Sequence, residues 1–282
     1  MNGDSFRVKH LLLFTILITF VLLPATFAQT PSTAAALEDQ LKADLSSGPC
    51  KNNERVEAVK ALFKKMGASD EEIKAEKIKD IQNVVVTKKG KSDETVIIGA
   101  HYDKVSDGCG IIDNWSGVVI LAHLYKTLSK METQKTYVFV AFDKEEVGKL
   151  GSAAMAKAIP KEKRSSYCAM VNLDAFGLGY SVILENVSNS KMIKAAKDLA
   201  GELKAPITGL NLAGVASSDS ASFIDKDIPA ITLSALSNKW PEFMHSSKDK
   251  MENVVIGSVR IGYLFGLEYV KKIDKAGCAD FR

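Results

Sequence analysis

The chain has no large excess of either charge, few cysteines, and no low-complexity linker or internal repeat. Its 37 basic and 34 acidic residues leave a net charge of only +3, which gives no indication of a nucleic-acid partner. Lys-rich segments such as 161–164 and 248–250 are interleaved with acidic residues, so we interpret them as solvated faces. With no linker to divide it, the chain is long enough for one large α/β domain.

The longest uncharged hydrophobic run lies in the N-terminal part of the chain. Residues 11–23 are uncharged and mostly apolar, and basic residues precede them. Thr26 and Ala28 place small side chains at −3 and −1 from a cleavage site before Gln29, which is typical of a secretory signal peptide over residues 1–28. A membrane anchor is the alternative, but the run is shorter than the ~20 residues that a span requires. We therefore expect a secreted or periplasmic protein, with no stable membrane insertion after signal cleavage.

The small set of cysteines could pair in three ways in an oxidising compartment: Cys50, Cys109, Cys168 and Cys278. Cys50 lies at the start of the first predicted helix of the domain, and Cys278 follows the last one. We therefore expect a Cys50–Cys278 disulfide that joins the two ends of the domain. Cys109 lies between His101 and Asp113, whose side chains are of types that bind metals, and could itself contact a metal, but it has no C-x-x-C partner, and a structural thiol is the alternative.

The region after the signal begins with a polar, Ala-rich segment of weak helical character, residues 29–48, and the predicted main domain follows over 49–282. An apolar stripe predicts a helix from 56 to 66. Two apolar stretches, 84–87 and 95–100, flank a Lys-Gly pair and predict a hairpin. The second stretch is almost wholly apolar, as in strands that are covered on both faces.

Strand and helix patterns then alternate along the chain. Further strands are predicted over 137–142, 169–174, 182–185 and 230–233, and helices over 116–128, 153–158, 191–203 and 254–273. Such βα order predicts a single three-layer α/β domain, with a mixed, mainly parallel sheet and helices on both faces.

Polar residues that could bind a metal follow several of these strands. His101 and Asp103 come directly after the strand 95–100, and both point to one side because strand side chains alternate. A carboxylate there can accept the second N–H of the imidazole and fix the tautomer that binds metal. A lone histidine at a strand end is more often structural, so Asp103 strengthens the metal interpretation.

The other candidate ligands occupy comparable positions. Asp113 precedes an apolar helix, where it could cap the helix or bridge two cations with its two oxygens. Glu145 and Glu146 follow a buried strand, so one could bind metal while the other acts as a general base. Asp174 ends another apolar strand, and His245 lies in a polar loop before the last helix. Each is ambiguous alone, yet together these imidazoles and carboxylates predict a pair of zinc ions.

Several successive motifs resemble those of the secreted co-catalytic di-zinc aminopeptidases, whose superfamily also contains glutaminyl cyclases and glutamate carboxypeptidases. The resemblance extends over residues 96–253 through the motifs Gly-Ala-His-Tyr-Asp, Asp-Asn-Trp-Ser-Gly, Phe-Asp-Lys-Glu-Glu-Val-Gly, Asn-Leu-Asp, Ser-Asp-Ser-Ala-Ser-Phe and His-Ser-Ser-Lys-Asp. It implies the zinc-dependent exopeptidase fold, peptide substrates and two zinc ions per chain.

The resemblance also implies a role for each candidate ligand. Asp113 would bridge the two ions. His101 and Asp174 would complete the coordination of one ion, and Glu146 and His245 would complete that of the other.

By the same resemblance, Glu145 is the general base and Asp103 supports His101. A hydroxide that bridges the metals would attack the peptide carbonyl, and Glu145 would carry its proton to the leaving amine. The free α-amine of the substrate would be held at one zinc, so the enzyme would remove N-terminal residues from peptides.

The chain departs from the family pattern at three positions. Ser220 stands where His usually follows Ser-Asp, Lys149 interrupts the usual Gly-Leu-x-Gly-Ser pattern, and Lys250 stands where Thr is common. None of these changes removes a predicted ligand or the base. The Ser220 change leaves the shape of the substrate pocket open.

Three alternatives to an aminopeptidase remain. A glutaminyl-peptide cyclotransferase would use one zinc and typically lacks the first histidine ligand, so His101 argues against it. A carboxypeptidase would need cationic groups that bind a terminal carboxylate. An inactive binding protein of the same fold would be expected to have lost Glu145 or a ligand, and neither is missing.

Overall fold

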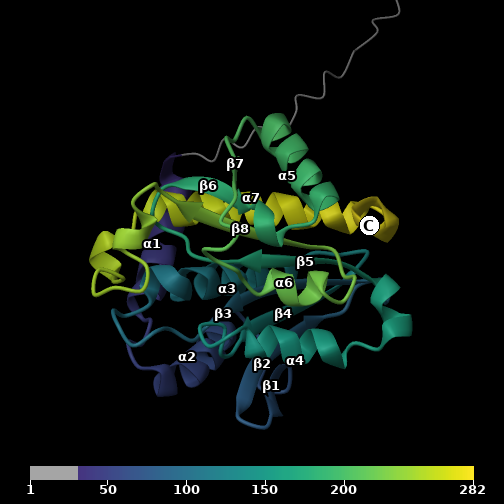
Figure 1. The fold of residues 1–282 in the computed structure, drawn as a ribbon, viewed down its shortest axis with the longest axis horizontal. Helices are drawn as coiled ribbons and strands as arrows, with labels where there is room; N and C mark the ends of the chain where they lie inside the picture. Colours follow the sequence, from purple (N-terminus) through teal and green to yellow (C-terminus); the bar gives the residue numbers. More distant parts are fainter. Residues whose placement is uncertain (1–30) are drawn as a thin grey trace, which may run out of the picture.

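The computed structural model describes residues 31–282, so the expected signal peptide over 1–28 lies outside the described residues. Within them, one eight-stranded sheet has the order β1-β2-β4-β3-β5-β8-β6-β7 (Figure 1). The strands are β1 (Ile73–Ile78), β2 (Ile81–Lys88), β3 (Thr95–His101), β4 (Thr136–Phe142), β5 (Tyr167–Leu173), β6 (Tyr180–Leu184), β7 (Thr208–Leu210) and β8 (Ala230–Leu236).

The central strands of the sheet are parallel. β3 pairs in parallel with both β4 and β5, β5 pairs in parallel with β8, and at the edge β6 pairs in parallel with β7. Antiparallel pairs occur between β1 and β2, between β2 and β4, and between β6 and β8. The expected mixed, mainly parallel sheet is therefore confirmed.

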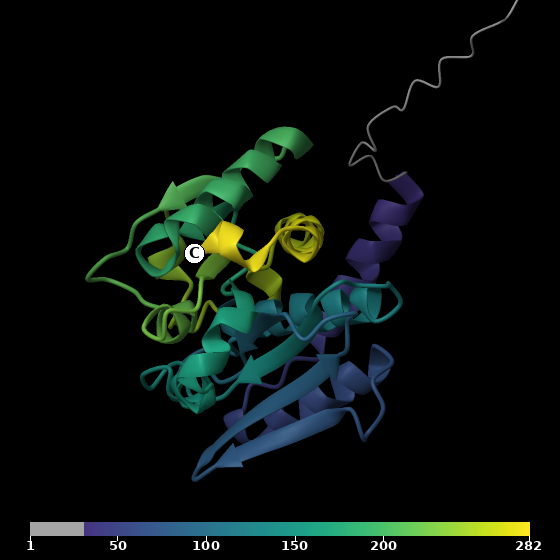
Figure 2. The same ribbon diagram turned by 90° about the vertical axis from the view of Figure 1, so that its right-hand side faces the viewer.

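Helices cover both faces of the sheet (Figure 2). Residues of α1, α2, α3, α5 and α7 pack into the larger core, and residues of α4 and α6 pack into a smaller core on the other face. The helices are α1 (Pro31–Ser46), α2 (Asn52–Lys65), α3 (Ser116–Leu128), α4 (Leu150–Ala158), α5 (Ser190–Leu203), α6 (Ser220–Ile224) and α7 (Ile256–Lys275). No helix in this part of the chain is both long and apolar enough to cross a membrane.

The alternation of side chains along β4 explains why this strand is apolar throughout. Phe139 and Ala141 contribute to the larger core, while Val140 and Phe142 contribute to the smaller one. Because successive strand residues point to opposite faces, a strand between two helical layers must be apolar at every position. Every residue of β3 is likewise buried.

The expected hairpin between residues 84–87 and 95–100 is wrong. β4 lies between β2 and β3, and the hairpin instead joins β2 to β1, with Lys79 in the left-handed conformation at the turn (φ 57°). The sequence IKAEKI of β1 has mostly exposed side chains and no hydrophobic alternation, because the strand lies at the edge of the sheet. Local patterns could not reveal that β4 enters between the two apolar stretches.

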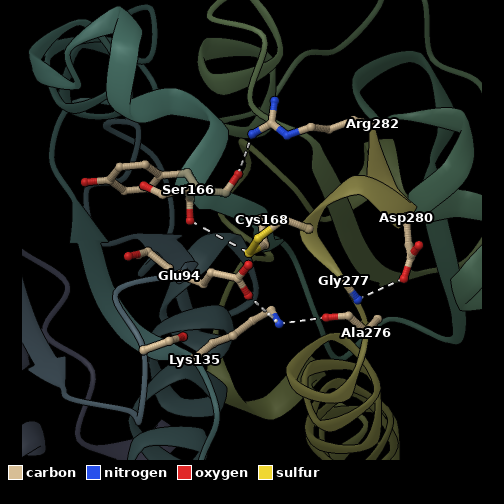
Figure 3. The surroundings of a disulfide bond; sticks show 12 residues. Glu94, Lys135, Ser166, Cys168, Ala276, Gly277, Asp280 and Arg282 are labelled. Carbon is tan, nitrogen blue, oxygen red and sulfur yellow. Dashed lines mark hydrogen bonds and ion pairs between the residues drawn. A yellow bond between two sulfur atoms is a disulfide. The ribbon is translucent and has the colours of Figure 1, made fainter.

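The expected Cys50–Cys278 disulfide is also wrong. The bonds are Cys50–Cys109 and Cys168–Cys278, with Cα–Cα distances of 4.1 and 4.3 Å. The segment before α2 lies against the loop that follows β3, whereas the segment after α7 reaches the start of β5. Figure 3 shows Cys168 beside that last segment, where Arg282 donates hydrogen bonds to the carbonyls of Arg164 and Tyr167. The two ends of the domain are thus each bonded to the sheet region and not to each other.

This pairing makes a direct prediction for the native protein. Digestion without reduction should release two disulfide-linked peptide pairs, one containing Cys50 and Cys109 and the other Cys168 and Cys278, because these are the cysteines that the fold bonds to each other. Mass spectrometry before and after reduction measures this. A peptide that joins Cys50 to Cys278 would contradict the structure.

Candidate metal centre

The predicted ligands gather at the carboxyl ends of the central parallel strands. His101 is the last residue of β3, Glu146 follows β4, and Asp174 directly follows β5. Because these strands are parallel neighbours, their carboxyl ends lie along the same edge of the sheet. Asp113, from the loop before α3, and His245, from the loop before α7, complete the cluster.

Asp113 faces two imidazoles with its two carboxylate oxygens. Its Oδ1 lies 3.2 Å from Nε2 of His101, and its Oδ2 lies 3.2 Å from Nε2 of His245. Each histidine also meets a second carboxylate: His101 Nε2 is 3.5 Å from Asp174 Oδ1, and His245 Nε2 is 3.0 Å from Glu146 Oε2. The residues thus form two groups that share Asp113. This is the grouping expected from the sequence. The roles of these five residues as metal ligands stay a prediction.

Asp113 is not the cap of α3. Its neighbour Asn114 contacts the first turn of that helix, because Asn114 Oδ1 accepts hydrogen bonds from the amides of Gly117 (3.0 Å) and Ala175 (3.1 Å). Asn114 Nδ2 donates to the carbonyl of Leu173 (2.8 Å), and the Asp113–Asn114 peptide bond is cis. Asn114 therefore links the loop of Asp113 to the end of β5, and the Asp113 carboxylate stays free for the histidines.

A second buried aspartate, which the sequence did not single out, orients the same loop. Asp249 accepts hydrogen bonds from the backbone amides of Ile112 (2.7 Å) and Asp113 (3.0 Å), and its own carbonyl accepts one from Cys109 (2.7 Å). It closes the His-Ser-Ser-Lys-Asp motif that also contains His245. Its position in that motif is the feature of the sequence that could have identified Asp249 as part of the site.

Asp103 has a broader role than expected. Its carboxylate lies 3.5 Å from Nδ1 of His101, which is closer to the Asp103 backbone carbonyl at 3.2 Å. The same carboxylate accepts hydrogen bonds from the amides of Glu145 (2.9 Å) and Glu146 (3.2 Å). Burial raises the pKa of Asp103, but the hydrogen bond and charge of His101, together with these two amides, outweigh burial and lower the pKa. Asp103 thus fixes the backbone of the predicted base and of a predicted ligand.

Arg55 of α2 is a buried cation beneath the centre that sequence reasoning missed. Its guanidinium donates to the carbonyls of Pro49 (2.9 Å), Tyr102 (2.7 Å) and Gly110 (2.8 Å), and also to that of Cys109. Burial lowers its pKa to about 10, although nearby aspartates raise it. Arg55 therefore remains charged and joins the end of β3 to the loop that leads to Asp113.

Carboxylates outnumber cations in this centre, and several of their oxygens have no hydrogen-bond partner. Among the described residues, Glu146 Oε1, Asp174 Oδ1 and both carboxylate oxygens of Asp219 are buried and unpartnered. Burial raises the pKa of Asp219 to about 7. It also raises the pKa of Glu145 to about 9, despite the charge of His101. Buried, unpaired carboxylate oxygens are unfavourable unless positive charge compensates them.

This donor set fits zinc. Carboxylate oxygens and imidazole nitrogens are ligands that zinc prefers, and the two groups around Asp113 supply both. A second cluster of Glu94, Cys168 and Cys278 does not fit, because both sulfur atoms belong to a disulfide. Cys109 is likewise bonded to Cys50 and offers no thiolate to a metal.

A pocket of about 340 Å³ opens over the centre. Its polar part includes His101, Asp113, Glu145, Glu146, Asp174 and His245. Its apolar part includes Leu184, Leu212, Val215, Leu236, Trp240 and Met244.

Ser220, which departs from the family pattern, does not line this pocket. The side chain is fully buried, and its hydroxyl lies 2.7 Å from the carbonyl of Val187 and 2.6 Å from the hydroxyl of Thr232. Ser217 and Ala216 line the pocket in this region. The neighbouring Ser218 instead donates a hydrogen bond to the carboxylate of Asp174.

Known proteins match part of this sequence. The chain is 31% identical over 120 residues to aminopeptidase Y of Saccharomyces cerevisiae, and 30% identical over 112 residues to aminopeptidase YwaD of Bacillus subtilis. These matches cover 42% and 39% of this chain but only 22% and 25% of the relatives, so the chain spans about a quarter of their lengths.

Solved structures resemble the chain over more of its length. LapA aminopeptidase of Legionella pneumophila has a TM-score of 0.69 at 19% identity and covers 87% of this chain and 72% of its own. A glutaminyl cyclase from an Acidobacteriales bacterium has a TM-score of 0.70 at 16% identity and covers 93% and 99%. At these identities the likeness shows the fold alone, which is the one shared by zinc-dependent exopeptidases.

The family itself follows from a longer match in sequence. The model of peptidase family M28 matches residues 83–261, which include every candidate ligand from His101 to His245. Since this match covers more than half of the chain, the protein belongs to peptidase family M28.

Proposed function

We propose that this protein is a zinc-dependent aminopeptidase with two zinc ions per chain. The observation that carries the proposal is that Asp113 turns one oxygen to His101 and the other to His245, each of which meets a further carboxylate. Asp113 and His101 with Asp174 would hold one ion, and Asp113 and His245 with Glu146 the other. When bound, the zinc ions polarise the peptide carbonyl and make water in the site more acidic.

The residue that moves the proton in this proposal is Glu145. Asp103 fixes its backbone amide, and its side chain lines the pocket beside the ligands. Burial and neighbouring carboxylates raise the pKa of Glu145 to about 9, and added positive charge lowers it toward the range in which a base works at neutral pH. Glu145 would take a proton from the attacking water and pass it to the leaving amine.

The curated relatives support an aminopeptidase over a carboxypeptidase, since aminopeptidase Y and aminopeptidase YwaD both match part of this chain. Glu145 is the one carboxylate among the pocket-lining residues that is not a proposed zinc ligand, so a negative charge remains near the metals for the α-amine of a peptide. The apolar wall, which includes Leu236 and Trp240, would receive an uncharged N-terminal side chain.

A comparison of unblocked and blocked substrates tests this proposal. The purified protein should hydrolyse leucyl-nitroanilide and leucyl peptides but not their N-acetylated forms, because acetylation removes the positive amine. Hydrolysis of both forms at similar rates would contradict an aminopeptidase. Release of pyroglutamyl peptide from a glutaminyl peptide, without hydrolysis, would identify the cyclase alternative instead.

The two groups of ligands around Asp113 predict the metal content. Purified protein should retain about two zinc ions per chain after dialysis, since a carboxylate shared between two imidazole-carboxylate groups suits a pair of ions. Elemental analysis measures the ratio. A ratio of one with full activity would contradict the two-ion arrangement.

We also propose that the protein acts outside the cytoplasm. Two disulfides are formed within the described residues, and such bonds persist in oxidising compartments. The sequence before Gln29 is of the signal-peptide type. Expression in a secreting host should therefore yield protein whose N-terminal residue is Gln29, which N-terminal sequencing can determine; exported protein that still begins at Met1 would contradict cleavage.

A further inference from the structure

Lys149 is a cation in the pocket whose role the proposed mechanism does not explain. It is the one lysine or arginine among the pocket-lining residues, all of which belong to the described part of the chain. It lies directly after the loop of the two glutamates, and its amide donates a hydrogen bond to the carbonyl of Glu145 (2.8 Å). It also stands where relatives of this type commonly have leucine.

The ammonium group of Lys149 has no partner within residues 31–282. It makes no hydrogen bond and no ion pair, not even with the pocket carboxylates, whereas Lys144 in the same loop is paired with Asp80. The backbone of Lys149 has a φ of 58°, a conformation that favours glycine or asparagine. A long cationic side chain is thus present at a position whose backbone does not favour it, in a residue that lines a pocket of carboxylates and imidazoles.

The sheet topology indicates which part of a substrate Lys149 would meet. Lys149 follows β4, whereas the apolar wall comes from β6, β8 and the segments after β7 and β8, on the other side of β3 and β5. If Glu145 delivers a proton to the leaving amine, the leaving residue must lie on the side of β4. Lys149 therefore lies on the side of the second substrate residue, away from the wall for the first.

We propose that Lys149 binds a carboxylate carried by the second residue of the substrate, which makes the enzyme selective for short or acidic peptides. The carboxylate could be the C-terminal group of a dipeptide or the side chain of an acidic second residue. This inference rests on the proposed aminopeptidase function, since it assumes that the first residue is the one released.

Two pairs of substrates separate these sources. The free acid Leu-Ala is compared with Leu-Ala-amide, and Leu-Asp-amide is compared with Leu-Asn-amide. Each comparison gives a ratio of kcat/KM for the charged over the neutral substrate. A ratio is the suitable readout because it does not depend on the fraction of active protein, so a variant that folds poorly still gives a valid result.

Lys149→Met removes the charge while keeping the length of the side chain. The wild type should prefer the charged member of at least one pair, and in Lys149→Met that ratio should fall about tenfold, as expected for loss of one charge-assisted hydrogen bond. Lys157→Met is the matched control, because Lys157 is an exposed lysine of α4 that does not line the pocket, and its ratios should equal those of the wild type.

The results either identify the source of the carboxylate that Lys149 binds or contradict the inference. A fall confined to the Leu-Ala pair identifies a dipeptide carboxylate, and a fall confined to the Leu-Asp pair identifies an acidic second residue. Unchanged ratios in Lys149→Met, with all four substrates hydrolysed, would overturn the role of Lys149 and leave the aminopeptidase proposal intact. Failure of the wild type to hydrolyse any of them would overturn both.

Discussion

Replacement of Glu145 by glutamine should lower the turnover of an unblocked leucyl substrate by about 10²–10⁴-fold, with the zinc content unchanged. The amide keeps the shape of the side chain but cannot accept a proton. Glu145 makes no contact with His101 or His245 within ion-pair distance, so its loss should not disturb the two groups around Asp113. Steady-state rates and elemental analysis of the same preparations measure both quantities.

Glu146→Gln is the informative comparison. Because Glu146 lies 3.0 Å from His245 and is a predicted ligand, this substitution should weaken zinc binding, and activity should fall with the metal content. Chelator-treated wild type controls for simple metal loss. Near-normal turnover in Glu145→Gln, or full metal content and activity in Glu146→Gln, would show that the two roles are assigned to the wrong residues.

Replacement of Arg55 by methionine should lower the free energy of unfolding by about 3–5 kcal/mol. The guanidinium is completely buried and satisfies carbonyl groups of Pro49, Tyr102, Cys109 and Gly110. Methionine fills similar space but leaves these carbonyls unpaired, and it removes positive charge from beneath an acidic centre.

Denaturant unfolding of the variant, monitored by fluorescence or circular dichroism, measures this loss. Arg260→Met is the matched control, because the Arg260 guanidinium pairs with a partly exposed Glu38 on the surface and its removal should cost less than about 1 kcal/mol. If Arg55→Met unfolds at the same denaturant concentration as Arg260→Met, then Arg55 does not stabilise the domain in the way described.

The fold and the ligand cluster could be predicted because their signals are local. A buried strand is apolar at each position, and a polar residue at its end is easily recognised, as at His101 and Asp174. Once the strands are parallel neighbours, such residues must converge. The sequence of one strand therefore contains most of the information about its part of the site.

The features that sequence reasoning missed depend on long-range pairing. The β1–β2 hairpin and both disulfides follow from which segments meet in space, and no local pattern records this. Arg55 did leave a signal, since it occupies the buried face of α2 at helical spacing with Val59, Leu62 and Phe63. An arginine on such a face is buried, so it must find several acceptors inside the protein.

The separation of the two histidines along the chain has a consequence for the order of events during synthesis. His101 and His245 face the same carboxylate, but β4, β5, β6, β7 and β8 all lie between them in sequence. A chain emerges from the ribosome with its N-terminal part first. A growing polypeptide therefore contains Asp113, Glu145 and Glu146 long before His245 has been synthesised. In the proposed mechanism, the ability to cut peptides would arise only when nearly the whole domain has been made and closed.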